Sequence, residues 1–319
     1  MSEGVRSKIS QAFQDARSAK GSARIDLLGR FGLLVPALAS STVIALILTF
    51  LWFESTLIFA SPEGGIGIII SPTWDPNRDL YGIAIFITGS FLCTIIAIGI
   101  AVPLGMAGAL FLSEFCPHRL RGPIRMIIEM MAAIPSIVYG LWAYLVITPW
   151  IASVLAPAFG VQSNGLSLLA GGIILAIMLL PTIVTVSDDA MRSVPRSLRE
   201  ASLALGATST ETARKVVMGA AMPGIGAAIV LSLGRAVGET MAVLMVTGNA
   251  LQIPYSLFDP TYVMTSIITN QLGYAFVFPL WRSALFAVAL ILLLMSISFT
   301  IMAKLFIRWG MKTRGLGQK

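Results

Sequence analysis

Stretches without any charged residue are the feature that most limits what this chain can fold into. Phe31 to Phe53 is 23 residues long without a charge, and Tyr81 to Leu112 is more than thirty residues long. A helix needs about 20 apolar residues to cross the hydrocarbon core of a bilayer. The sequence therefore predicts an all-α integral membrane protein.

The composition supports the same class and argues against others. Charged residues make up 12% of the chain, against about 25% in soluble domains, and apolar residues reach 56%. The formal net charge is +7, but the basic residues lie beside the apolar stretches, as membrane topology requires, so we expect no nucleic acid partner. The single histidine, His118, rules out a two-histidine metal site, and we expect no metal on this chain.

Six stretches of suitable length are predicted to span the membrane. They are residues 31–53, 81–112, 126–147, 166–186, 220–247 and 283–303. The first could instead be a signal peptide, but its apolar run exceeds the usual ~7 to 15 residues, so an uncleaved span is favoured. Glu129, near the start of the third span, is expected to pair with Arg125 one turn earlier.

Small residues recur at every fourth position in two of these spans. This spacing lets two membrane helices approach closely. The second span carries Ala97, Ala101, Gly105 and Ala109, and the fifth carries Ala220, Gly224, Ala228, Ser232, Ala236 and Thr240. We expect both faces to be helix contacts. For the second span, the alternative is that the spacing arose by chance in a stretch rich in alanine and glycine.

The distribution of basic residues predicts the orientation. Apart from Arg235, 19 Lys and Arg residues lie in the two termini and in alternate loops, and 2 lie in the remaining loops. Because cytoplasmic segments carry the excess of positive charge, both termini are expected in the cytoplasm. The loop between the fourth and fifth spans falls on the same side.

That loop, residues 188–218, is predicted to contain two short helices. Pro195 suits the first turn of a helix, and Gly206 suits the left-handed residue that follows its end. Thr208 and Glu211 form a Thr-x-x-Glu capping box that opens the second helix. One face of the first helix is narrow and mostly apolar, with Leu198, Ala201, Ser202 and Leu205. Such a helix could be offered to a partner or be a solvated connector.

Two charged residues fall inside the fifth span. A charge at the bilayer centre costs roughly 2.5 to 3.5 kcal/mol on insertion scales, so such residues normally face a bundle interior or a water path. Arg235 and Glu239 are four apart, which would place them on one helix face and let them pair. Spacing alone leaves two readings open, a structural ion pair and a pair of pathway charges.

Three motifs resemble those of binding-protein-dependent ABC importer permeases. Glu200-Ala201-Ser202, then three residues and Gly206, resembles the EAA loop, which docks into a groove on a cytoplasmic ATPase. Residues 233–243, LGRAVGETMAV, look like the signature of PstC-type phosphate permeases. Residues 133–140, AIPSIVYG, are common to both permease subunits of that system. Together the resemblance covers about residues 80 to 305.

One departure from the family concerns the end of the EAA-like loop. In the family pattern, nine residues separate the glycine from Ile-x-Leu-Pro. Here those positions are Val216, Val217, Met218 and Gly219, and the nearest proline is Pro223. The sequence leaves open how the loop continues into the fifth span.

The resemblance implies a type I ABC importer permease fold (MetI-like) and a domain plan. Residues 1–30 would be a cytoplasmic segment, 31–53 the first transmembrane helix and 54–80 an extracytoplasmic loop. The permease domain would be residues 81–303, with the loop 188–218 inside it, followed by a cytoplasmic tail, 304–319.

The resemblance also implies partners and roles. A PstA-type permease, a PstB-type ATPase dimer and an extracytoplasmic phosphate-binding protein would complete an importer of inorganic phosphate in the cell membrane. Arg235 and Glu239 would be the pathway charges. The ATPase would contact the loop helix, at Leu198, Glu200, Ala201, Leu205 and Gly206.

Energy for such transport would come from outside this chain. The sequence has no Gly-x4-Gly-Lys-Ser/Thr phosphate loop, so ATP and magnesium are expected on the ATPase, and no enzymatic activity is expected here. Alternatives are a permease for another oxyanion, such as molybdate or sulfate, and a secondary transporter working alone. An integral membrane enzyme is disfavoured because catalytic motifs such as Gly-x-Ser-x-Gly are missing.

Overall fold

A computed structural model describes residues 33–62 and 64–313, so the predicted segment 1–30 and the end of the tail lie outside the described residues. The chain divides into two units, residues 1–53 and 54–319, which are considered separately. The helix Leu33–Ala60 begins in the first unit and is apolar along its length. It continues seven residues beyond Phe53, where the sequence predicted the first span to end.

A small irregular segment precedes the long helices of the second unit. It comprises η1 (Ile66–Ile69), β1 (Trp74–Asp75), η2 (Pro76–Arg78) and β2 (Leu80–Tyr81), with the two strands antiparallel. Trp74 packs edge-on against Tyr81 and Phe86, whose rings lie 5.6 and 5.2 Å away between centroids. These contacts hold the segment against the start of α2.

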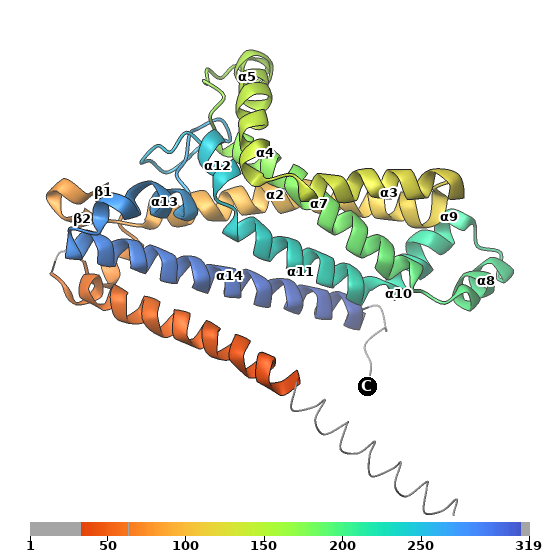
Figure 1. The fold of residues 1–319 in the computed structure, drawn as a ribbon. Coiled ribbons are helices and arrows are strands. Elements are labelled where there is room, and N and C mark those ends of the chain that lie inside the picture. Colours follow the sequence, from red (N-terminus) through yellow and green to blue (C-terminus); the bar gives the residue numbers. More distant parts are fainter. Residues whose placement is uncertain (1–32, 63, 314–319) are drawn as a thin grey trace, which may run out of the picture. The chain divides into compact units, whose positions relative to one another are not determined.

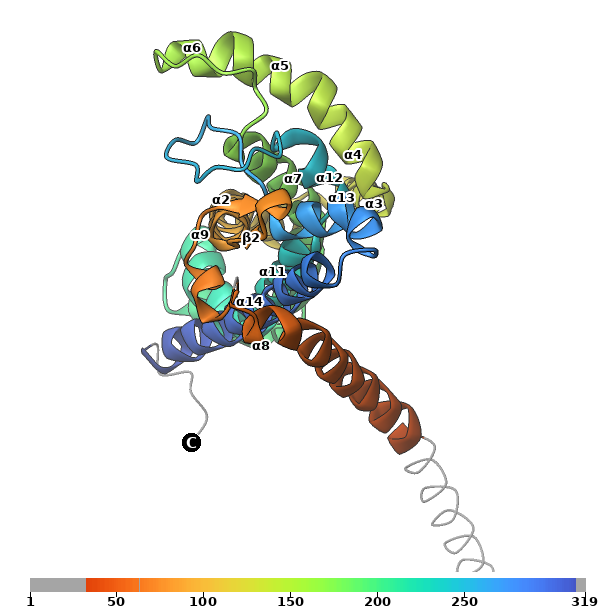
Figure 2. The ribbon, with the colours of Figure 1, turned by 90° about the vertical axis from the view of Figure 1, so that its left-hand side faces the viewer.

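Helices α2 (Ala84–Leu110) and α7 (Leu168–Arg192) form the centre of the second unit. Figure 1 shows α7 and α11 (Met222–Gly238) side by side, with α14 (Pro279–Thr313) next to α11. A short π-helical segment, η3 (Phe111–Phe115), extends α2. Figure 2 shows that the helices from α4 to α6 curve away from this group.

Small residues allow α2 and α7 to pack closely, as the spacing predicted. Ala97, Ala101 and Ala109 have no exposed surface, and Gly105 is also buried. A Cβ on Gly105 would lie 2.6 Å from Cγ2 of Ile183 on α7. The small residues at every fourth position of the fifth span also form a contact face, because a Cβ on Gly224 would lie 2.4 Å from Cβ of Ala190.

The prediction of a third span at residues 126–147 was wrong. Residues His118–Ala133 form a separate helix, α3, and the membrane-length helix is Ser136–Ala158. This longer helix contains α4 (Ser136–Trp142), η4 (Ala143–Ile147), α5 (Thr148–Trp150), η5 (Ile151–Leu155) and α6 (Ala156–Ala158).

Proline causes the break between α3 and α4. Ile134 adopts an extended conformation, as residues before proline prefer. Pro135 cannot donate to the carbonyl of Met131, which accepts from the Ile134 amide at 3.3 Å and from the Tyr139 hydroxyl at 2.8 Å. A backbone amide and a side chain together satisfy the carbonyl that proline leaves without its helical donor.

The fifth span also differs from its predicted form. Helical residues 209–220, comprising α9 (Ser209–Glu211), η6 (Thr212–Val217) and α10 (Met218–Ala220), meet α11 at a bend of 69°. Pro223 occupies the first turn of α11, a position that suits proline, so the span continues from the loop through a new helix start. Helix α11 ends at Gly238, and α12 (Met241–Val246) follows, so the predicted helix 220–247 is interrupted at both ends.

The last part of the chain contains more helix than was predicted. Residues Met264–Ala275 form α13 within the segment expected to be a loop, and α14 extends beyond 283–303 in both directions. In the described residues, five helices are long and apolar enough to span a membrane, and the bent pair makes six. This number agrees with the six predicted spans.

The close packing of α2 on α7 can be tested with two glycines of the same helix. Gly105→Ala should destabilise the protein by about 1 to 3 kcal/mol, because the buried Ile183 side chain cannot move away from the new methyl group. Gly99→Ala should have little effect, since no atom lies within 4 Å of its added Cβ. Thermal unfolding in detergent measures both, and equal unfolding temperatures for the two variants would contradict this packing.

Candidate functional site

The loop helix α8 (Arg196–Ala204) exposes the apolar side chains that the sequence predicted to face a partner. Leu198 and Leu205 are exposed, the latter to 90%, and Leu203 adds a third exposed leucine that the predicted stripe omitted. Glu200 and Ala201 are exposed on the same helix. Large apolar side chains gathered on one short helix are typical of a contact surface for another protein.

The end of the first loop helix and the start of the second are capped as predicted. Gly206 has a φ of 85°, the left-handed conformation that favours glycine, and its amide donates to the carbonyl of Leu203. Thr208 and Glu211 form the reciprocal capping box that opens the second helix. The hydroxyls of Ser202 and Thr212 lie 2.9 Å apart and connect the two helices. The turn between them is therefore defined by local sequence.

Arg199 attaches the other face of α8 to the membrane helices. Its Nη2 lies 2.9 Å from Oε1 of Glu114, at the end of η3, and it also donates to the carbonyls of Met191, in the last turn of α7, and of Val194, just after it. Both Arg199 and Glu114 are largely buried. The sequence indicated only that Arg199 points away from the apolar stripe. Its partner lies 85 residues earlier, which no local pattern could reveal.

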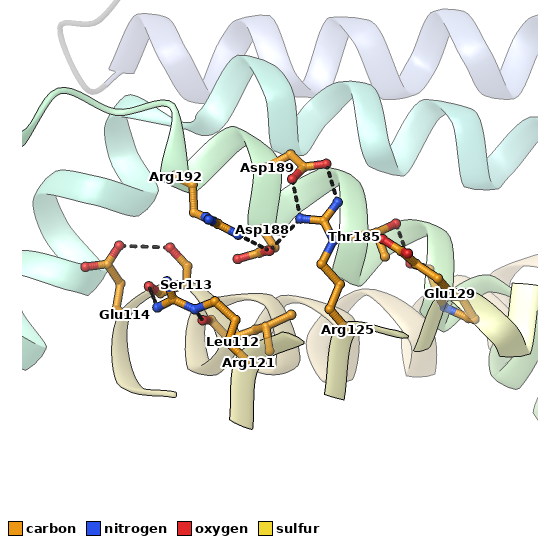
Figure 3. A network of polar contacts seen from close by, with 11 residues as sticks. Leu112, Ser113, Glu114, Arg121, Arg125, Glu129, Thr185, Asp188, Asp189 and Arg192 are labelled. Atoms are coloured by element: carbon orange, nitrogen blue, oxygen red, sulfur yellow. Dashed lines mark hydrogen bonds and ion pairs between the residues drawn. The ribbon is translucent and has the colours of Figure 1, made fainter. Parts of the chain in front are cut away.

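A second arginine joins α3 to the end of α7 (Figure 3). Arg125 donates to Glu129 at 2.7 Å, which confirms that predicted pair, and also contacts Asp188 and Asp189. The hydrogen bonds to Asp189 and Glu129 raise the pKa of Arg125 above its usual value. Asp188 is fully buried, so loss of Arg125 would leave a carboxylate without its closest cation.

Arg121 completes this cluster by capping the end of η3. It donates from Nε to the carbonyl of Leu112 at 2.9 Å and from Nη2 to that of Ser113 at 2.8 Å (Figure 3). Arg121, Arg125 and Arg199 therefore connect four pieces of the chain, namely η3, α3, α7 and α8. Since each contact is charge-assisted, the four pieces are held together more firmly than neutral hydrogen bonds would hold them.

Arg235 and Glu239 do not form the pair that their spacing predicted. Helix α11 ends at Gly238, and Glu239 has an extended backbone, so the two residues do not share a helix face. Within the described residues, no carboxylate lies within 4 Å of the Arg235 guanidinium. The structural ion pair is therefore not formed.

Each of these two charges has its own surroundings. Glu239 accepts from the amide of Ala242 at 3.5 Å, and its carbonyl accepts from the Thr265 hydroxyl at 2.9 Å, which connects the break to α13. Arg235 is partly buried near the Tyr139 hydroxyl of α4. A partly buried guanidinium without a carboxylate partner in the described chain has donors available for an anion.

Comparison with known proteins identifies the family. The profile of the binding-protein-dependent transport system inner membrane component matches residues 101–309. This chain belongs to that family. The matched region includes the loop helix and both membrane charges, and it makes the chain a transport subunit of the multi-pass membrane type rather than an enzyme.

Relatives of this chain cover nearly its whole length. A phosphate transport system permease protein PstC from Mesorhizobium japonicum is 37% identical, over 92% of this chain and 95% of the relative. A probable ABC transporter permease, YqgH from Bacillus subtilis, is 41% identical over 84% and 85% of the two chains. A PstC protein from Haemophilus influenzae is 35% identical over 89% and 92%.

Solved structures confirm the expected fold class. A chain of a bacterial ABC transporter for import of the acidic polysaccharide alginate has a TM-score of 0.59 at 14% identity, covering 86% of this chain and 95% of its own. A chain of the inward-facing MetNI methionine ABC transporter has a TM-score of 0.53 at 20% identity, over 74% and 98%. Identities this low support the type I importer permease fold and nothing about the solute.

Arg199 should determine how firmly α8 is held. Arg199→Met leaves Glu114 without its cation and removes the bonds to two carbonyls, so hydrogen exchange of the amides of residues 196–205 should accelerate at least tenfold. Arg214→Met is the matched control, because Arg214 is exposed on the same loop and has no partner in the described chain. Unchanged exchange in Arg199→Met would show that other contacts hold α8.

Proposed function

We propose that this chain is the permease subunit of an ATP-driven importer of inorganic phosphate. The observation that carries the proposal is the exposed leucine face of the loop helix, formed by Leu198 and Leu205, on a chain that has no phosphate loop of its own. Such a chain needs an ATPase partner, and α8 is the surface suited to bind one. The phosphate transport names of the PstC relatives support phosphate as the solute.

The partners follow from this function. A PstA-type permease would complete the transport path, a PstB-type ATPase dimer would bind at the loop helices, and a phosphate-binding protein would deliver the solute from the opposite side. With α8 facing the ATPase, both chain termini lie in the cytoplasm, in keeping with the excess of basic residues on that side.

Transport would proceed by alternating access. Closure of the ATPases on ATP would displace α8, and the arginine contacts would pass this movement to η3, α3 and the end of α7. Arg235 would bind phosphate transiently, because its planar guanidinium matches the spacing of phosphate oxygens. Weak binding suits a pathway, since selectivity can reside in the separate binding protein.

The role of Arg235 is tested by a neutral substitution of similar shape. Arg235→Gln should abolish phosphate uptake by the reconstituted importer while the complex still assembles, because Arg235 has no ion pair in the described chain whose loss would unfold it. Arg78→Gln, at an exposed position beside β2, is the control. Normal uptake by Arg235→Gln would remove this residue from the pathway.

The docking role of α8 is tested by placing a charge on its apolar face. Leu205→Glu should reduce capture of the ATPase at least tenfold, since a carboxylate would be buried without a partner in the interface. Ser197→Glu, exposed on the same helix, should leave capture unchanged. Equal capture by Leu205→Glu and the unmodified chain, measured by co-purification in detergent, would contradict docking on this face.

A further inference from the structure

A cavity lies between the loop helix and the ends of the membrane helices. Its volume is about 290 Å³. Segments η3, α3, α7 and α8 surround it with four arginines, a glutamate and a serine, namely Arg121, Arg192, Arg196, Arg199, Glu114 and Ser113. The cavity is separate from Arg235 and from the exposed leucines of α8, and none of the functions above uses it.

The charges that line the cavity are unbalanced. Glu114 is its one acidic residue, and that carboxylate already accepts from Arg199 and from the Ser113 hydroxyl. Arg199 directs all its nitrogens to Glu114 and to the carbonyls of Met191 and Val194. The pair Glu114 and Arg199 therefore neutralises itself and leaves three further guanidinium groups around the cavity.

These three guanidinium groups retain unused donors. Arg121 uses Nε and Nη2 on backbone carbonyls, which leaves Nη1. Arg192 forms an ion pair with Asp188 at 3.8 Å, but that carboxylate is shared with Arg125 and the distance is too long for a good hydrogen bond. Arg196 makes no hydrogen bond or ion pair within the described chain. The remaining nearby acid, Asp189, is bound to Arg125.

Arg121 and Arg196 have no carboxylate partner in the described chain, and Arg192 shares Asp188 with Arg125, so the three guanidinium groups repel each other across the cavity unless a further anion lies between them. Guanidinium groups from different helices can each present donors to a different oxygen of a tetrahedral anion, which gives strong charge-assisted bonds. We propose that this cavity binds a tetrahedral oxyanion, inorganic phosphate, from the cytoplasmic side. The choice of phosphate rests on the proposed function; the charge and the cavity apply to any such oxyanion.

Binding here would affect the loop helix. Arg196 belongs to α8, Arg192 to the end of α7 and Arg121 to α3, so one anion would connect the ATPase-docking helix to two other helices. Phosphate that has accumulated in the cytoplasm would thus restrain the movement of α8. The importer would slow as its product rises, by a site on the permease itself.

The test is equilibrium binding of radioactive phosphate to the whole complex in phosphatidylcholine nanodiscs, without binding protein. All complexes carry Arg235→Gln, so that the transport path does not contribute, and the ATPase sites are filled with a non-hydrolysable ATP analogue. Adding Arg192→Gln and Arg196→Gln should weaken phosphate binding at least tenfold relative to the parent complex. Adding Arg214→Gln, exposed on the same loop but outside the cavity, should not.

Arg196→Gln alone guards against a folding defect, because that side chain has no partner in the described chain, and it should weaken binding by several-fold. Binding that is equal in the parent and the double variant would overturn the proposal. Loss of binding when phosphatidylglycerol replaces phosphatidylcholine would assign the cavity to a lipid headgroup and overturn its assignment to free phosphate.

Failure of the proposed function can be distinguished from failure of this binding site. It would appear as absence of phosphate uptake by the unmodified complex, which the binding assay does not involve. If the chain imports another oxyanion, radioactive sulfate or molybdate would bind the parent complex and phosphate would not. That result would overturn phosphate as the ligand of this cavity.

Discussion

The exclusion of charge from hydrocarbon determines where this chain can place its polar contacts. Most of its ion pairs between segments distant in sequence lie, within the described residues, at the ends of η3, α3, α7 and α8, around Arg125 and Arg199. The helices between those ends pack through small residues such as Ala97 and Gly105. Apolar packing holds the membrane part together, and charge-assisted bonds hold the loop helices to it.

This division would let α8 bind the proposed ATPase partner and still transmit movement. Leu198 and Leu205 are exposed, while Arg199 of the same helix is held by Glu114 and two carbonyls. A helix attached only by apolar contacts would slide, whereas directional bonds to several segments resist rotation and translation together. Force applied to the leucine face should therefore reach η3 and α7 rather than be lost in the loop.

Features that depend on neighbouring residues could be predicted from the sequence, and features that depend on distant ones could not. The capping box at Thr208 and the left-handed Gly206 follow from local chemistry. Pro103 and Pro181 lie within continuous helices, whereas Pro135 separates α3 from α4. At that break the Tyr139 hydroxyl, 8 residues from Met131, donates to the Met131 carbonyl. The end of α11 at Gly238 separated Arg235 from Glu239, and the partners of Arg199 and Arg125 lie 85 and 63 residues away. The roles of Arg235 and of the α8 residues remain predictions.

The central claim is that phosphate transport by this chain needs energy delivered through α8 by a separate ATPase. The most direct measurement is phosphate uptake into proteoliposomes that contain the assembled complex and the external binding protein, with ATP present or absent on the ATPase side. Uptake should require ATP and be lost in a complex carrying Gly206→Pro and Glu200→Lys, which alter the loop helix. Uptake at the same rate without ATP would contradict the account and indicate a transporter that works alone.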